Sequence, residues 1–306
     1  MKLLYILLIA TIIPGCSIHA IQASGGEGSV SSVIGFESKV TLGNPVTQKT
    51  EQKTDEPTEY SPAEYNLDWT YAGARLVAHA GGNIDNIQGT NTIDAVRYNY
   101  SIGQRVFELD FNLTSDDILV GIHDWGAKNE ALTLEEFSSR KIHDRYTPST
   151  YADFIRFLSE HKDSFIVTDT KSYDLSDEQI IKQFQIMYDI TEDVDPETRE
   201  RVVIQVYNQN MYHVINRIYK YPNILYTLYA TPDTEEQILE FVETERIPVV
   251  VMPPERANQP FLDKLYTLGT KIYLHTLNDI NEVKEWQSKG IWGVYTDSLL
   301  PKDFIQ

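Results

Sequence analysis

The sequence is poor in cysteine and in positive charge, and its one long apolar run is too short to cross a membrane comfortably. Cys16 is the only cysteine among 306 residues, which excludes a disulfide within the chain and a thiolate metal cluster. Lys and Arg number 26 against 45 Asp and Glu, a formal net charge of −19. Nucleic acid is therefore not an expected partner, because a phosphate backbone requires a basic surface. An anionic substrate would need local positive charge, such as a metal ion.

The apolar run lies at the N-terminus, over residues 1–16, and follows a single lysine. This pattern indicates an export signal. Its last four residues, Ile13, Pro14, Gly15 and Cys16, resemble a bacterial lipoprotein cleavage box. The resemblance implies cleavage before Cys16, a lipid on that cysteine, and a membrane-anchored protein of the cell envelope. An ordinary signal peptide and a secreted protein are the alternative.

Residues 17–68 are rich in Ser, Gly, Thr, Glu, Lys and Pro and show no apolar period. Such composition predicts a disordered linker. A flexible coil of this length spans about 40 Å on average, from roughly 5–6 Å multiplied by the square root of its length. That distance is enough to hold a following domain clear of a membrane surface.

Residues 69–306 alternate short apolar runs with helix-like segments, and we assign them to one domain. The predicted strands are residues 76–82, 106–112, 165–171, 202–207, 224–230, 248–253, 271–277 and 293–297. The predicted helices include residues 92–102, 151–161, 177–190, 234–243 and 279–289. Eight strands that alternate with helices imply parallel pairing, and about 240 residues in this pattern predict an α/β fold of the (β/α)₈ TIM-barrel type.

One further strand-like run, residues 118–124, does not fit the count of eight. Only a few residues separate it from the run 106–112, whereas a parallel crossover needs a dozen or more. We therefore predict a small hairpin insertion after the second strand. The hairpin would return His123 to the mouth of the barrel, above Glu108.

Glu108 and Asp110 are the most informative pair, because residues two apart in a strand share a face. Two neighbouring carboxylates in a fold repel each other and lose hydration, and a bound cation is the simplest remedy. Strand ends carry the active sites of such barrels. There Asp169 can be a third ligand of the cation, or equally the ion-pair partner of Lys171. His79 ends the first apolar run, beside this predicted metal site.

An ordered set of short motifs then points to a family. They are His79-Ala80-Gly81-Gly82, Thr90-Asn91-Thr92, Glu108-Leu109-Asp110, His123-Asp124 and the last strand Gly293 to Asp297. From about residue 74 to its end, the chain resembles the glycerophosphodiester phosphodiesterases, which belong with the phosphatidylinositol-specific phospholipase C-like barrels. The usual series in that family is His-Arg-Gly, Glu-Asn-Thr, Glu-x-Asp, His-Asp and Glu-x-Lys.

The resemblance implies a metal-dependent phosphodiester hydrolase. His79 and His123 would be the catalytic acid–base pair, and Glu108, Asp110 and Asp169 would hold Ca²⁺ or Mg²⁺. Hard cations of this kind take carboxylate oxygens and polarise a phosphoryl oxygen. The candidate substrate-binding residues are Lys171, Asn91, Gln205 and His275. A helix cap is the alternative role for Asn91, and a structural role is the alternative for Gln205 and His275.

Three positions depart from the family series. Ala80 replaces the arginine that clamps the phosphate, which removes a charge-assisted contact. Thr90 and the shorter Asp169 each replace a glutamate. These departures suggest a small-molecule, lipid or glycan phosphodiester other than glycerophosphodiesters. Two rival functions stay open: a non-catalytic lipoprotein that binds phosphate or glycans, and a glycoside hydrolase that uses two carboxylates on the same kind of barrel.

Overall fold

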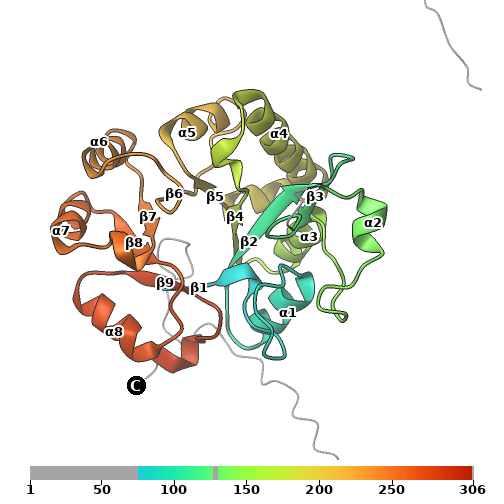
Figure 1. The fold of residues 1–306 in the computed structure, drawn as a ribbon, viewed down its shortest axis with the longest axis horizontal. Helices are drawn as coiled ribbons and strands as arrows, with labels where there is room; N and C mark the ends of the chain where they lie inside the picture. Colours follow the sequence, from blue (N-terminus) through green and yellow to red (C-terminus); the bar gives the residue numbers. More distant parts are fainter. Residues whose placement is uncertain (1–74, 127–129, 305–306) are drawn as a thin grey trace, which may run out of the picture. The chain divides into compact units, whose positions relative to one another are not determined.

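The computed structural model describes residues 75–126 and 130–304. The predicted signal segment with Cys16 and the predicted linker 17–68 lie outside the described residues. The described part is a closed barrel of parallel strands surrounded by helices (Figure 1). The prediction of a (β/α)₈ TIM barrel is therefore confirmed. In this part of the chain, no helix is both long and apolar enough to cross a membrane.

The barrel closes because the first strand pairs with both the second and the last strand. The remaining parallel strands follow one another around the ring in chain order. The strands are β1 (Leu76–Ala78), β2 (Val106–Leu113), β3 (Leu119–Gly121), β4 (Phe165–Asp169), β5 (Val202–Val206), β6 (Ile224–Thr227), β7 (Val249–Met252), β8 (Lys271–Leu274) and β9 (Gly293–Thr296).

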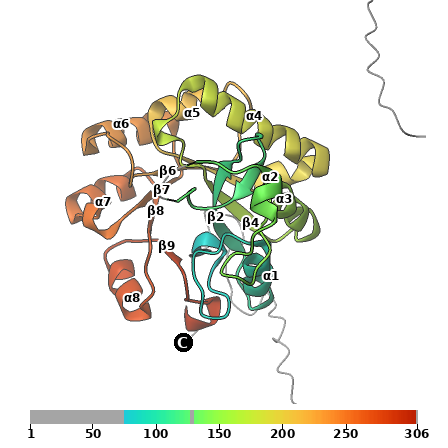
Figure 2. The same cartoon turned by 45° about the vertical axis from the view of Figure 1, so that its right-hand side comes forward.

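The helices lie outside the ring, between consecutive strands (Figures 1 and 2). They are α1 (Ile93–Ser101), α2 (Leu134–Ser138), α3 (Tyr151–Glu160), α4 (Asp177–Val194), α5 (Gln209–Ile215), α6 (Glu235–Glu245), α7 (Gln259–Thr267) and α8 (Ile280–Ser288). Several begin at hydroxyl side chains that complete capping boxes, as Thr150, Ser176 and Thr234 do for α3, α4 and α6. Such caps satisfy backbone N–H groups that a helix leaves unpaired at its first turn.

Alternation along β2 divides its side chains between two environments. Phe107, Leu109 and Phe111 point outward and are fully buried against the helices. Val106 points into the barrel, where it packs with a separate inner cluster of side chains that includes Val167 of β4. Glu108 and Asp110 lie two and four residues after Val106 in the same strand. Their carboxylates therefore point to the same side as Val106, into the barrel.

The third strand confirms the predicted hairpin. β3 runs antiparallel to β2, with Phe111 opposite Gly121, and it lies beside β2 outside the closed ring (Figure 1). A side chain at Gly121 would meet the backbone oxygen of Asn91 at 2.5 Å. Only glycine therefore allows the hairpin to approach the loop that carries Asn91.

Candidate active site

The first strand ends in a sharp turn that places His79 at the mouth of the barrel. Ala80 and Gly81, within a short 3₁₀ turn (His79–Gly81), have φ values of 49° and 84°, and Gly82 follows at 86°. The two glycines allow this tight turn, because such φ values suit glycine. The turn also directs the backbone N–H of Ala80 at Glu108 Oε2, 3.0 Å away.

Three acidic side chains form one buried cluster at this mouth. Glu108 and Asp110 of β2 are each 2% exposed, and Asp169 at the end of β4 is 5% exposed. Asp110 and Asp169 are direct neighbours across the two strands. One carboxylate oxygen from each residue lies within 4.8 Å of the others. Burial, and then the charge of Asp110, raise the pKa of Glu108 above its ordinary value, and a positive charge beside Glu108 would oppose this shift.

Asn91 holds Asp110 through two hydrogen bonds. Its amide Nδ2 donates to Asp110 Oδ2 at 2.8 Å, and its Oδ1 accepts from the backbone N–H of Asp110 at 2.9 Å. The side chain that caps α1 is Thr92, not Asn91, so the alternative role for Asn91 as a helix cap is wrong. Asn91 therefore acts on a carboxylate of the cluster and fixes its orientation.

Lys171 supplies a positive charge on the other side of the cluster. Its ammonium lies 2.8 Å from Asp110 Oδ1 and 2.8 Å from Asp169 Oδ2. Burial alone would lower the pKa of Lys171, but the charges of Asp169 and Asp110 outweigh it and raise the pKa above its ordinary value. Lys171 is therefore a charged bridge between two of the three carboxylates.

The carboxylate of Asp169 is also surrounded by other donors. The hydroxyl groups of Tyr207 and Tyr229 donate to it, the latter at 3.1 and 3.0 Å from its two oxygens. The backbone N–H of Lys171 adds a contact of 3.2 Å to Oδ1. With the lysine ammonium, four donor groups reach an anion that has about four lone-pair sites. Of the two roles left open for Asp169, these contacts favour the ion-pair partner of Lys171 over the third cation ligand.

Glu108 and Asp110 are better suited than Asp169 to bind a hard cation. Glu108 accepts one hydrogen bond, from Ala80, and Asp110 has a fixed orientation. Both are buried carboxylates that point into the barrel, and oxygen ligands of this kind suit Ca²⁺ and Mg²⁺. The donor set is thus compatible with a divalent cation at these two residues.

His79 lies against the same cluster and is oriented by the last strand. Its Nδ1 is 2.8 Å from Asp297 Oδ1, and its Nε2 is 4.0 Å from Glu108 Oε2. Asp297 is itself held by Asn278, whose Nδ2 donates to Oδ2 at 2.8 Å. Burial opposes a charge on His79, but the hydrogen bond to Asp297 and the nearby carboxylate charges raise its pKa to about 9. In the cation-free protein, His79 therefore carries a proton at neutral pH.

His123 follows the hairpin strand at the edge of the same site. The preceding residue, Ile122, donates its backbone N–H to the carbonyl oxygen of Asp110 at 3.0 Å. Asn112 Nδ2 donates to the carbonyl oxygens of Ile122 and His123, at 3.0 and 3.1 Å. The His123 ring is bonded to Asp124 at 2.7 Å, and 63% of its side chain is exposed. The hairpin brings the backbone that precedes His123 to Asp110, and the position of the His123 ring above Glu108 and its catalytic role stay predictions.

A small polar cavity of about 40 Å³ lies inside the barrel beside the cluster. Gln205 and His275 line it, together with Thr227 and Tyr295. Thr227 Oγ1, His275 Nε2 and the Tyr295 hydroxyl are buried without a hydrogen-bond partner in the described protein. Burial lowers the pKa of His275 to about 4, so this imidazole is neutral. The cavity is large enough for one or two water molecules or a hydroxyl group of a ligand.

The predicted site residues thus come from separate strands to one end of the barrel. Three further residues contact the site: Asp297, for which the sequence favoured a structural role, and Tyr207 and Tyr229, for which it favoured packing over lining a ligand pocket. Asp297 follows the last strand and Tyr207 follows β5, which is the position expected of active-site residues in such a barrel. Their pairing with His79 and Asp169 depends on how the ring closes, and the chain carries no local signal of it.

Comparison with known proteins places this geometry in context. Residues 79–300 match the model of the glycerophosphoryl diester phosphodiesterase family. No curated protein matches the chain. Many solved structures resemble it. A glycerophosphodiester phosphodiesterase from Parabacteroides distasonis has a TM-score of 0.62 and 17% identity, and the match covers 75% of this chain and 94% of that one.

Two further structures show the same fold. A phosphodiesterase from Oleispira antarctica, solved in complex with the product sn-glycerol-3-phosphate, has a TM-score of 0.60 and 15% identity, with coverage of 73% and 93%. A glycerophosphodiester phosphodiesterase from Thermotoga maritima has a TM-score of 0.57 and 19% identity, with coverage of 73% and 94%. At these identities the structural likeness establishes the fold alone.

Proposed function

The chain belongs to the glycerophosphoryl diester phosphodiesterase family and is therefore a phosphoric diester hydrolase, and from this premise we propose that it cleaves a phosphodiester at the cluster of Glu108, Asp110 and His79 with the help of a divalent cation. The observation that carries the proposal is the buried carboxylate pair of β2, which faces the imidazole of His79 at the mouth of the barrel. Family membership gives no support to the alternative of a glycoside hydrolase.

The proposed cation ligands are Glu108 and Asp110. A divalent cation such as Ca²⁺ or Mg²⁺ supplies Lewis acidity, which polarises a phosphoryl oxygen of the substrate. Without it, a phosphodiester monoanion would approach several buried carboxylates and be repelled. Lys171, which is held between Asp110 and Asp169, adds a second positive charge. This charge partly replaces that of the family arginine, whose position is occupied here by Ala80.

His79 is the proposed proton donor. Its Nδ1 is occupied by Asp297, so the opposite ring nitrogen, which lies on the side of Glu108, is available to the reacting phosphate. In its protonated form, the ring can donate a proton to a leaving alcohol oxygen. His123 is the proposed partner that takes a proton from the attacking water or substrate hydroxyl group, whose oxygen forms a bond to phosphorus as the bond from phosphorus to the leaving oxygen breaks. Each such transfer typically contributes about 10²–10⁴ in rate.

The test uses the purified protein and bis(p-nitrophenyl) phosphate, an activated diester. We expect hydrolysis with Ca²⁺ or Mg²⁺, loss of hydrolysis with a chelator, and a fall of about 10² or more in kcat for His79→Ala and for His123→Ala. His213→Ala, a change of an exposed histidine on α5, is the matched control and should leave kcat unchanged. Full activity in both active-site variants would overturn the mechanism.

A non-catalytic binding protein remains the second candidate, because Ala80 replaces the phosphate-clamping arginine of the family series. It predicts that Ca²⁺ or Mg²⁺ raises the melting temperature although no diester is turned over. The same two measurements, melting and hydrolysis, therefore separate the two candidates.

We also propose that Cys16 carries a lipid that anchors the protein to a membrane of the cell envelope, with residues 17–68 as the tether. The support is the apolar segment that ends at this cysteine. Cells that express the protein should retain it in the membrane fraction, and Cys16→Ser should release it from that fraction. Equal membrane retention of both forms would contradict the proposal.

A further inference from the structure

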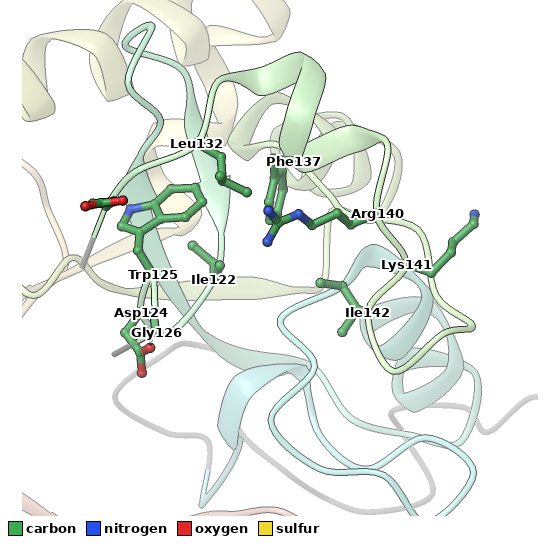
Figure 3. A pocket seen from close by; sticks show the side chains of 10 residues that line it. Ile122, Asp124, Trp125, Gly126, Leu132, Phe137, Arg140, Lys141 and Ile142 are labelled. Carbon is green, nitrogen blue, oxygen red and sulfur yellow. Dashed lines mark hydrogen bonds between the residues drawn. The ribbon is translucent and has the colours of Figure 1, made fainter. Parts of the chain in front are cut away.

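A second and larger cavity lies next to the hairpin. Its volume is about 520 Å³, and it is lined by residues 122–126, which follow β3, and by residues 130–142 around α2 (Figure 3). We call it the hairpin pocket. A volume of this size lies in the range of pockets that bind organic ligands of drug size, about 300–1,000 Å³. It is far larger than a small alcohol such as glycerol or ethanolamine requires.

The hairpin pocket adjoins the catalytic mouth through the backbone of the hairpin. Ile122 and Asp124 both line it, and they flank His123. The same Ile122 is bonded to the carbonyl oxygen of Asp110, which belongs to the carboxylate cluster. The hairpin pocket therefore borders the backbone on both sides of His123, next to the strand that carries Asp110.

The lining of the hairpin pocket is mainly apolar. Trp125 and Phe137 meet edge to face, with ring centroids 5.8 Å apart, and Phe137 is 3% exposed. The other apolar lining side chains are Ile122, Leu132 and Ile142. Exposed apolar surface gathered in one concave site is typical of a ligand site, because scattered apolar residues would not form a continuous wall.

The charged residues of the lining are Asp124, Glu130, Arg140 and Lys141. The guanidinium of Arg140 points into the hairpin pocket, whereas Lys141 points away from it (Figure 3). Lys141 donates instead to Thr147 Oγ1 at 3.2 Å. Arg140 forms no salt bridge with any described carboxylate. It is thus available to a polar oxygen of a ligand whose apolar part contacts Trp125 and Phe137.

We propose that the hairpin pocket binds an apolar alkyl or acyl chain carried by one of the two alcohols of the phosphodiester. This inference rests on the proposed function and narrows its substrate class to amphiphilic phosphodiesters, of which lysophospholipids are the simplest natural kind. The phosphate lies at the carboxylate cluster, the chain lies against Trp125 and Phe137, and Arg140 contacts a polar oxygen between them. A polymer of phosphodiesters would instead require several cations along its path, and the pocket holds one inward-pointing cation.

The binding test is independent of turnover. Methyl phosphate and octyl phosphate are titrated calorimetrically into the Ca²⁺-loaded protein, with octyl phosphate kept below its micelle concentration. We expect octyl phosphate to bind at least about tenfold more tightly, because each buried methylene is favourable. Trp125→Ala and Leu132→Ala should each reduce this preference several-fold. Trp286→Ala, which changes a partly buried tryptophan on α8, is the matched control and should leave the preference intact.

The turnover test then compares methyl and octyl 4-nitrophenyl phosphate. We expect a higher kcat/KM for the octyl diester, and a ratio that falls toward one in Trp125→Ala. Equal binding of the two monoesters, or a preference that Trp125→Ala and Leu132→Ala leave unchanged, would overturn the hairpin pocket as a chain site. Tight octyl binding without hydrolysis of either diester would refute the proposed function and leave this assignment standing.

Discussion

Removal of the Asn91 side chain is the most direct test of how the cluster is built. Asn91 is 1% exposed, and its amide makes two hydrogen bonds to Asp110, at 2.8 and 2.9 Å. Its backbone has φ of 51°, in the left-handed region that asparagine and glycine tolerate best. Alanine and glycine at this position both remove the hydrogen bonds, but only alanine adds backbone strain.

The magnitudes follow from these two features. A partner that orients a metal ligand typically contributes about 10–100-fold to metal affinity, so both Asn91→Ala and Asn91→Gly should weaken Ca²⁺ or Mg²⁺ binding by that factor. A hydrogen bond to a charged group contributes about 1.5–3 kcal/mol to the free energy of unfolding. Left-handed strain adds about 1–2 kcal/mol for a residue with a Cβ. Asn91→Ala should therefore unfold more easily than Asn91→Gly by about 1 kcal/mol.

The assay is isothermal titration calorimetry with each cation, combined with urea unfolding of the chelated protein. Circular dichroism confirms that both variants are folded before titration. If both variants fold and bind the cation as tightly as the parent protein, then either Asp110 is not a ligand or Asn91 does not orient it. If alanine and glycine are equally destabilising, the backbone argument is refuted.

Three further predictions concern the neighbouring residues. Asp169→Asn should lower cation affinity less than Asp110→Asn, because Asp169 accepts from Tyr207 and Tyr229 as well as from Lys171; an equal loss of affinity in calorimetry would restore Asp169 as a ligand. Tyr229→Phe removes a hydroxyl that donates to Asp169 and should cost about 1 kcal/mol in urea unfolding, whereas no change would assign this contact no energetic role. The raised pKa of His79 stabilises the chelated protein fully below pH 6.5, and this contribution is lost as the pH rises to about 9. His79→Gln should therefore flatten the fall in unfolding free energy between those two pH values. An unchanged pH profile would contradict the assignment.

The barrel and half of the site could be predicted because they follow from local pattern. Alternation in β2 fixed the shared face of Glu108 and Asp110, and the short connection to residues 118–124 required a hairpin rather than a parallel crossover. Helices of one or two turns were not named from the sequence, among them α2 and α5 (Gln209–Ile215). Such segments have too few residues to show a period.

The other half of the site depends on contacts between distant elements. Tyr207 follows β5 and Tyr229 follows β6, and both donate to Asp169 of β4 because β4, β5 and β6 are consecutive in the ring and their ends meet at one mouth. Asp297 meets His79 because the last strand pairs with the first. Lys171 has a long flexible side chain. For this reason, the sequence alone left open whether its ammonium would contact Asp169 or the substrate.

The charges of the assembled site explain why a cation and Lys171 are both needed. Glu108, Asp110, Asp169 and Asp297 contribute four negative charges when ionised, and Lys171 with protonated His79 contributes two positive ones. A divalent cation cancels the remainder and leaves a neutral site, which a phosphodiester monoanion can enter without net repulsion. The arginine of the family series would make such a site positive. Its replacement by Ala80 removes that excess, so more of the substrate affinity must come from groups other than the phosphate, such as an apolar chain in the hairpin pocket.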